Sequence, residues 1–165
     1  MDREATIKSR GWLTIELRDA DGKIKYKKIK KNTLTNTGFA ASAARLMDNT
    51  TEAAFDYIAV GTDDGTILPL AAGNTALGAE IVDPGGAGLI RANDATPTRS
   101  DGAVTNDTTE INVTFNVSGS KSVAEYGLFN AAVSGGVMLA RQLDTALPLV
   151  SGDQLSVTWK IQHTA

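Results

Sequence analysis

One carboxylate stands inside an otherwise apolar run of the sequence. Glu125 lies in VAEYGLFN (residues 123–130), where small and apolar residues flank it on both sides. Burial in such a setting raises a carboxyl pKa, so Glu125 could act as a general acid. It could instead pair with Arg141 or Arg91, because an unpaired buried charge costs on the order of several kcal/mol. No second catalytic group accompanies it, so we expect a structural salt bridge between Glu125 and Arg141.

The other residues that could do chemistry match no catalytic or metal-binding pattern. His163 is the single histidine, whereas a triad or a multi-histidine metal site needs further partners. The stretch DADG (19–22) resembles the start of a calcium loop, but Lys30 stands at the twelfth position, where a bidentate Glu is required. Asp63 and Asp64 could help to bind a cation, although turn formation also explains them. We expect no catalytic residue, metal or cofactor, and a protein that is not an enzyme.

Six lysines fall within the nine residues KIKYKKIKK (23–31). They could bind phosphates of a nucleic acid, protect an exposed strand edge from aggregation, or contact an acidic protein partner. No nucleic-acid-binding module is recognisable and the rest of the chain is acidic, so we expect no nucleic acid and keep the other two interpretations, which are compatible. The residues expected to contact a partner are Lys23, Lys25, Tyr26, Lys27, Lys28, Lys30 and Lys31.

Charge is distributed unevenly along the chain, whose formal net charge is −3. Residues 1–31 carry ten Lys or Arg against five Asp or Glu, a net charge of +5. Residues 32–165 carry six against fourteen, a net charge of −8. A basic arm on an acidic body favours docking against a complementary surface, because such fields govern association.

Alternation of apolar and polar residues predicts most of the secondary structure. EINVTFNVS (110–118) and LSVTWKIQH (155–163) alternate strictly, as half-buried strands do. Residues 11–31 predict two strands around Asp21-Gly22, a pair that suits a tight hairpin turn. AAFDYIAVG (53–61) is denser in apolar residues, which favours a central strand covered on both faces.

One segment has helical spacing instead. In NTGFAASAARLMDN (36–49), apolar side chains recur every three to four residues. We expect a short amphipathic helix at about 37–48, capped by Thr37 or Asn36. The residues expected on its buried face are Phe39, Ala43, Leu46 and Met47.

Residues 61–108 are rich in Gly, Pro, Asp, Asn and Thr and predict loops, with short strands near 80–82 and 89–92. Loops of this length are usually functional or interfacial. The strand at 123–130 is apolar on both faces, so we expect it between layers or in a subunit interface.

The fold expected from these elements is mainly β: an antiparallel β-sandwich or jelly-roll-like domain with one short α-helix. The 165 residues form a single domain (1–165), with a basic N-terminal β-hairpin arm at 1–31 and a body at 32–165. The chain has no cysteine, which suits folding in a reducing cytosol. No segment reaches the ~18 apolar residues of a membrane span, and no signal-peptide core follows the N-terminus, so we expect no membrane contact.

Several segments together resemble a group of small tailed-bacteriophage virion proteins. They are NTLTNTGFAASAARLM, DYIAVGTDDGT with NTALGAEI, VAEYGLFNAAVSGGVMLARQL, and VTWKI. A helix after a TN-x-G turn, an IAVG…TALG-E segment and an E-x-GLF…MLAR hairpin occur in this order in that group. The resemblance covers about residues 32–161, and its motifs are structural.

The resemblance implies a non-enzymatic virion structural protein, of the capsid decoration (cement) type. Such a protein would bind the major capsid protein lattice and stabilise the head. It would lie on the capsid surface of the virion, after assembly in the host cytoplasm. We also expect it to associate with itself as a homo-oligomer, a trimer at a local three-fold axis. The alternative is a tail, baseplate or fibre-associated virion protein with a receptor role in glycan binding.

Overall fold

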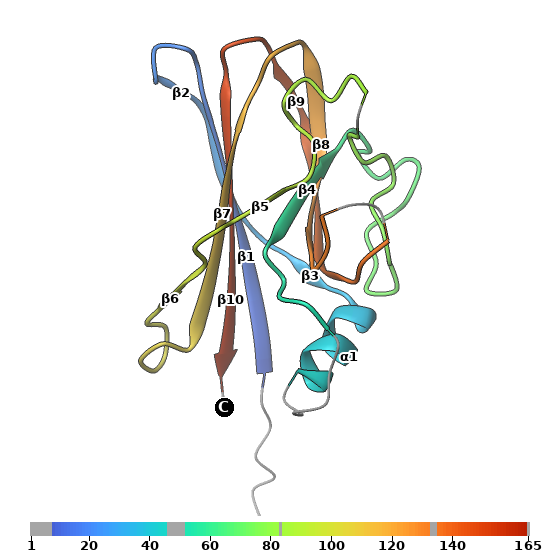
Figure 1. The fold of residues 1–165 in the computed structure, drawn as a ribbon, viewed down its shortest axis with the longest axis vertical. Helices are drawn as coiled ribbons and strands as arrows, with labels where there is room; N and C mark the ends of the chain where they lie inside the picture. The colour runs from blue at the N-terminus through green and yellow to red at the C-terminus, as the bar shows by residue number, and fades with distance from the viewer. Residues whose placement is uncertain (1–7, 46–51, 83, 133–134, 165) are drawn as a thin grey trace, which may run out of the picture.

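The computed structural model describes residues 8–45, 52–82, 84–132 and 135–164, which fold into two antiparallel β-sheets and one short helix (Figure 1). One sheet has the order β2-β1-β10-β7-β6 and the other β3-β9-β8-β4-β5. The first comprises β1 (Lys8–Arg18), β2 (Ile24–Lys31), β6 (Thr98–Ser100), β7 (Thr108–Asn116) and β10 (Gln154–Thr164). The second comprises β3 (Thr33–Leu34), β4 (Tyr57–Gly61), β5 (Ala92–Asn93), β8 (Lys121–Phe129) and β9 (Met138–Leu149), and the helix is α1 (Asn36–Ala44). The mainly β, sandwich-like fold expected from the sequence is confirmed.

Strict alternation fixes the faces of the first sheet. β10 pairs with β1 along the whole length of β1 and with β7 along the whole length of β7. Apart from Trp12, the apolar residues of these strands face the second sheet and are at most 6% exposed: Leu13, Ile15, Leu17, Ile111, Val113, Phe115, Leu155, Val157, Trp159 and Ile161. Because successive side chains of a strand point to opposite faces, the polar residues between them meet solvent.

The basic hairpin belongs to the sandwich and is not a separate arm. Its turn forms as predicted, with Gly22 at a φ of 80° and Asp19 Oδ1 accepting the N–H groups of Asp21 and Lys23. However, β1 lies between β2 and β10 and contributes Leu13, Ile15 and Leu17 to the core. Residues 1–7 of the predicted arm lie outside the described residues. The sequence prediction was wrong because β1 finds a second partner strand at the far end of the chain.

The N-cap of helix α1 lies before the two predicted caps, and the helix buries a different face from the predicted one. Thr35 Oγ1, rather than Thr37 or Asn36, accepts the N–H of Gly38 at 3.0 Å. Gly38 and Ala41 are buried, whereas Phe39 is 46% exposed and Ala43 is exposed. The helix approaches β9 so closely that a Cβ on Gly38 would lie 2.5 Å from Leu139 Cα. Small residues therefore face the sheet; the predicted contacts Leu46 and Met47 lie outside the described residues.

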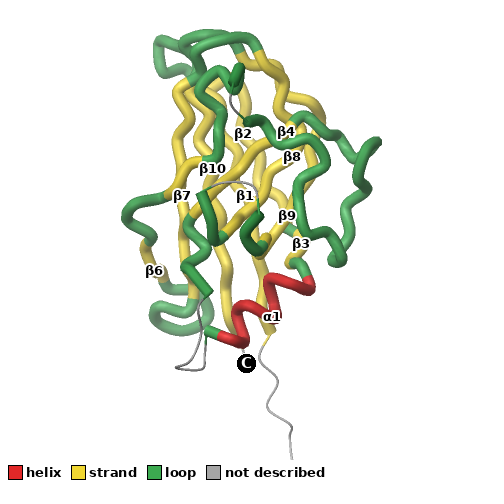
Figure 2. Tube along the Cα trace, turned by 45° about the vertical axis from the view of Figure 1, so that its right-hand side comes forward, coloured by secondary structure: helices red, strands yellow, loops and turns green. Residues whose placement is uncertain are grey.

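A long loop of the chain covers the outer face of the second sheet. Residues 62–80 run along β8 and β9 on the side away from the first sheet, as both views show (Figures 1 and 2). Leu77 from this loop packs with Ala59, Phe129 and Met138. Both faces of β8 and β4 are therefore buried, as expected, but within one protomer. Of the short strands predicted in this tract, the structure has an isolated bridge between Glu80 and Gly61, and β5 at Ala92–Asn93.

Candidate functional site

Glu125 and Arg141 form an ion pair beneath the covering loop. Nη2 of Arg141 lies 2.8 Å from Oε2 of Glu125, and both side chains are 0% exposed. Glu125 comes from β8 and Arg141 from β9, and the pairing register shifts between Val123 and Glu125. This irregularity is a local break in the ladder, of the kind that re-aims a side chain. The two residues paired in the sequence analysis thus lie together in the structure.

The cluster around this pair saturates its hydrogen-bonding groups with the chain's own atoms. Arg141 also donates to Asp63 Oδ2 at 3.2 Å and to Asn74 Oδ1 at 3.0 Å. Glu125 accepts the backbone N–H groups of Gly78 at 2.9 Å and Ala79 at 2.6 Å. A carboxylate that accepts four N–H groups, two from the backbone and two from Arg141, is suited to holding the loop on the sheet.

Asp63 organises the start of the same loop. Burial raises the pKa of Asp63, but the backbone N–H groups of Ile67, Gly65 and Leu68, together with Arg141, hold the pKa below its ordinary value. Its two carboxylate oxygens are occupied by these donors at 2.9 to 3.2 Å. The Asp63-Asp64 pair therefore forms a turn. Within the described ranges, no group of three or more Asp, Glu or His side chains could hold a metal ion.

His163 lies at the exposed end of β10 and is held by a partner. It pairs in register with Ser9 of β1, and its Nδ1 lies 2.9 Å from the Ser9 hydroxyl. The frayed strand end expected from the sequence is therefore not what the structure shows.

Several lysines of the basic strand β2 form ion pairs within the molecule. Their acidic partners were not identified in the sequence analysis. Lys28 Nζ and Tyr26 Oη each lie 2.7 Å from Asp144 on β9, and Lys30 Nζ lies 3.3 Å from the same carboxylate. Lys25 binds Asp153 at 2.8 Å. The Asp144 and Asp153 side chains are only 2% exposed. The contacts with Asp144 join the edge of one sheet to the other, and the contact of Lys25 with Asp153 ties the same edge to the turn between β9 and β10.

Electrostatics agree with this arrangement. Burial raises the pKa of Asp144, but the hydrogen bonds from Lys28 and Tyr26 outweigh burial and hold the pKa below its ordinary value. Lys25 acts in the same way on the pKa of Asp153. No local pattern in the sequence marks these two aspartates, because each is more than 100 residues from its lysine.

The remaining lysines of the expected contact set differ in whether they form an ion pair. Lys27 pairs with Glu16 at 2.7 Å on the outer face of the first sheet. Lys23, in the hairpin turn, and Lys31, at the end of β2, form no ion pair with the described residues. Arg10 of β1 is likewise exposed and without an ion pair there. Of these three cations, Lys31 and Arg10 line one pocket.

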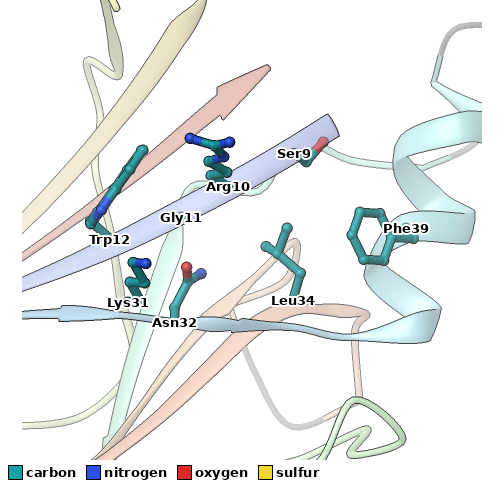
Figure 3. Close-up of a pocket in the computed structure, with 8 residues that line it drawn as sticks. All are labelled: Ser9, Arg10, Gly11, Trp12, Lys31, Asn32, Leu34 and Phe39. Carbon is teal, nitrogen blue, oxygen red and sulfur yellow. The ribbon is translucent and has the colours of Figure 1, made fainter. Parts of the chain in front are cut away.

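This pocket of about 360 Å³ lies where β1, the end of β2 and helix α1 meet (Figure 3). We call it the cationic pocket. The residues with larger side chains that line it are Arg10, Trp12, Lys31, Asn32, Leu34 and Phe39. Trp12 is half-buried and stands opposite Lys31 on one side and Lys160 on the other. Both polar atoms of the Asn32 amide are buried and have no hydrogen-bond partner in the described protein. The amide rests against Gly11, where a Cβ would lie 2.0 Å from its Oδ1.

Sequence reasoning named Lys31 but not Arg10, Trp12, Asn32 or Phe39 as parts of a site. Arg10 and Trp12 precede the lysine run by more than ten residues, and only the β1–β2 pairing brings them beside it. Phe39 was expected to be core. Phe39 is instead exposed, because the helix packs its small residues, and not Phe39, against the sheet.

Among the described residues, no helix has the length and apolar character needed to cross a membrane. Comparisons of the chain with protein-family models, with curated proteins and with solved structures found no match.

Proposed function

We propose that this chain is a non-enzymatic structural protein of a tailed-bacteriophage virion, a capsid decoration protein that binds the major capsid protein lattice. The observation that supports a binding role is the division of charge in the structure. The buried carboxylates Glu125, Asp63, Asp144 and Asp153 are bound by cations and N–H groups of their own chain. Several exposed cations form no ion pair with the described residues, and two of them, Arg10 and Lys31, line one pocket, where they can meet an acidic partner.

A decoration protein of this kind acts by mass action. It binds the assembled lattice and not the free subunits, so binding shifts the equilibrium toward the intact shell. At a free concentration one hundred times Kd, each site contributes about 2.7 kcal/mol. Repetition over the lattice multiplies that contribution. A rigid sandwich suits the task, because a preorganised surface loses little conformational entropy on binding.

The proposed homo-oligomer, a trimer at a local three-fold axis, rests on lattice symmetry alone. The two-sided apolar strand that first suggested a subunit interface is covered by residues 62–80 of the same chain. Light scattering of the purified protein measures its oligomeric state in solution, and imaging of decorated capsids shows whether the bound copies are grouped in threes. A monomer both in solution and on capsids would remove the trimer while leaving lattice binding intact.

Imaging of purified virions with a count of this protein's copies tests the proposal. Hundreds of copies on the shell support a decoration protein. A handful on the tail axis would support the tail or baseplate alternative, and absence from virions would overturn both. Emptied shells with and without added protein provide the functional measurement: added protein should raise the temperature at which the shells disassemble.

One observation favours the alternative with a glycan-binding role. Trp12 and the 46%-exposed Phe39 present aromatic surface in the cationic pocket, and exposed aromatic rings form platforms for sugars. A glycan array probed with the protein and with Trp12→Ala separates the two functions. Binding that depends on Trp12 would support the receptor role, and silence of the array would remove it.

A further inference from the structure

We infer that the cationic pocket binds an acidic peptide segment of a protein partner, with a carboxylate between Arg10 and Lys31 and an apolar side chain against Leu34 and Phe39. The inference rests on the proposed function and gives it a contact site on this chain. The pocket lies at one end of the sandwich, beside helix α1 (Figure 3).

Charge selects an anionic occupant. Four lysines of the basic strand have carboxylate partners within the chain: Lys25, Lys27, Lys28 and Lys30. Arg10 and Lys31 have none among the described residues, and no described residue that lines the pocket is acidic. Two cationic residues that line one pocket attract a carboxylate, and an arginine can bind it in bidentate fashion.

The amide of Asn32 selects a peptide group. Its Nδ2 and Oδ1 lack partners in the described protein, and a buried polar group without a hydrogen bond costs about 1–3 kcal/mol. A primary amide offers one donor side and one acceptor, which match the C=O and N–H of a peptide backbone. Both atoms are covered in the unbound protein, so the side chain must turn outward to meet an occupant. The unmet hydrogen bonds favour that turn.

The apolar wall explains why a peptide fits better than a polyphosphate. Leu34 and Trp12 are half-buried and Phe39 is 46% exposed, so a large part of the lining is apolar. A nucleic acid would be held by many cations along a track, whereas this site has two. A volume of about 360 Å³ lies at the small end of ligand sites and suits a few residues of an extended segment.

The probe is a fluorescein-labelled hexapeptide that alternates Asp with Leu, and the matched peptide has Asn in place of Asp. Fluorescence anisotropy should detect binding of the acidic peptide only, and added salt should weaken it. Arg10→Gln and Lys31→Gln should each weaken binding at least tenfold. The control is Lys23→Gln, which removes the same charge from the hairpin turn, outside the pocket, and should leave binding unchanged.

Trp12 supplies a second readout. The chain has two tryptophans, and Trp159 is 0% exposed in the core, so a peptide-dependent change in tryptophan emission should vanish in Trp12→Phe. Circular dichroism confirms that each variant folds. Equal weakening by Lys23→Gln and Lys31→Gln would mean attraction by net charge and would overturn the inference, as would the absence of binding by the acidic peptide.

Capsid binding separates this inference from the function on which it rests. If shells bind the protein and the Arg10→Gln and Lys31→Gln variants equally, the pocket is not the contact and the inference fails while the proposed function stands. If the protein binds the acidic peptide through the pocket but never binds shells, the proposed function fails. Loss of shell binding in both variants, with retention in Lys23→Gln, supports both.

Discussion

Arg141 and Glu125 face each other at 2.8 Å with no exposure to solvent, and they are joined on the same side by Asp63 at 3.2 Å from the arginine. The three side chains come from β9, β8 and the covering loop. Burying charges is costly, and the arrangement is stable only while every partner is present. The cluster therefore specifies where residues 62–80 lie on the sheet.

Arg141→Met should lower the free energy of unfolding by about 3–5 kcal/mol, because it leaves Glu125 and Asp63 buried without their cation. Urea denaturation measures this change. Hydrogen exchange should accelerate first in residues 62–80, since the loop loses its anchor. The double variant Arg141→Met with Glu125→Gln should recover part of the loss.

The matched control is Lys160→Met, which breaks the pair between Lys160 and Glu110 at 2.8 Å on the outer face of the first sheet. Their side chains are 43% and 30% exposed, so the loss should stay within about 1 kcal/mol. An equally small loss for Arg141→Met would contradict the anchoring role.

Local patterns predicted most of the strands but few of the tertiary contacts. Period-two alternation placed Ile111 and Trp159 in the core correctly, because a strand's faces follow from the sequence alone. The Asp21-Gly22 turn could also be predicted locally, because this residue pair readily adopts the positive φ values of a tight hairpin turn. The Glu125–Arg141 pairing could be proposed because the two strands are joined by a short connection.

Contacts between distant segments could not be read in this way. Nothing in the sequence around Asp144 indicates that its partners are the lysines of β2, because these lie on a strand more than 100 residues away. The prediction of the buried face of α1 was wrong because glycine carries no apolar side chain and so does not count toward a helical pattern. The close approach of Gly38 to Leu139 nevertheless requires a residue without a side chain. Arg10 enters the cationic pocket only through strand pairing.

Gly38→Ala should destabilise the protein by about 1–3 kcal/mol, even though alanine is the better helix former. The added Cβ would lie 2.5 Å from Leu139 Cα and 2.8 Å from its carbonyl oxygen, so α1 must move off β9. Thermal unfolding followed by circular dichroism measures the loss. Gly73→Ala is the control, because a Cβ there meets nothing within 4 Å. Unchanged stability for Gly38→Ala would mean that the helix is not packed tightly on β9.

Acid should destabilise the fold through several aspartates. Burial raises the pKa of Asp107, but its hydrogen bonds with Val104, Thr108, Gln162 and Ala103 outweigh burial and lower the pKa from 3.8 to about 2. The pKa values of Asp144 and Asp153 are also lowered. A carboxyl group with a depressed folded-state pKa stabilises the fold above its unfolded pKa and ceases to do so as pH falls through the folded value. The free energy of unfolding should therefore be constant near neutrality and fall from about pH 4 toward pH 2. Asp107→Asn should flatten that decline, and an unchanged slope would argue against its contribution.

The lysines of β2 should separate into residues that stabilise the fold and a residue that binds. Lys28→Gln and Lys30→Gln together remove both lysines that contact Asp144. This double variant should lower the free energy of unfolding by about 1–2 kcal/mol, because charged hydrogen bonds contribute about 1.5–3 kcal/mol and partial exposure reduces that value. Lys31→Gln should leave the unfolding free energy within about 0.5 kcal/mol and weaken binding of the acidic hexapeptide at least tenfold. Urea denaturation and peptide anisotropy on the same samples test both effects, and the reverse assignment would mean that the inward-facing lysines, and not the cationic pocket, meet the partner.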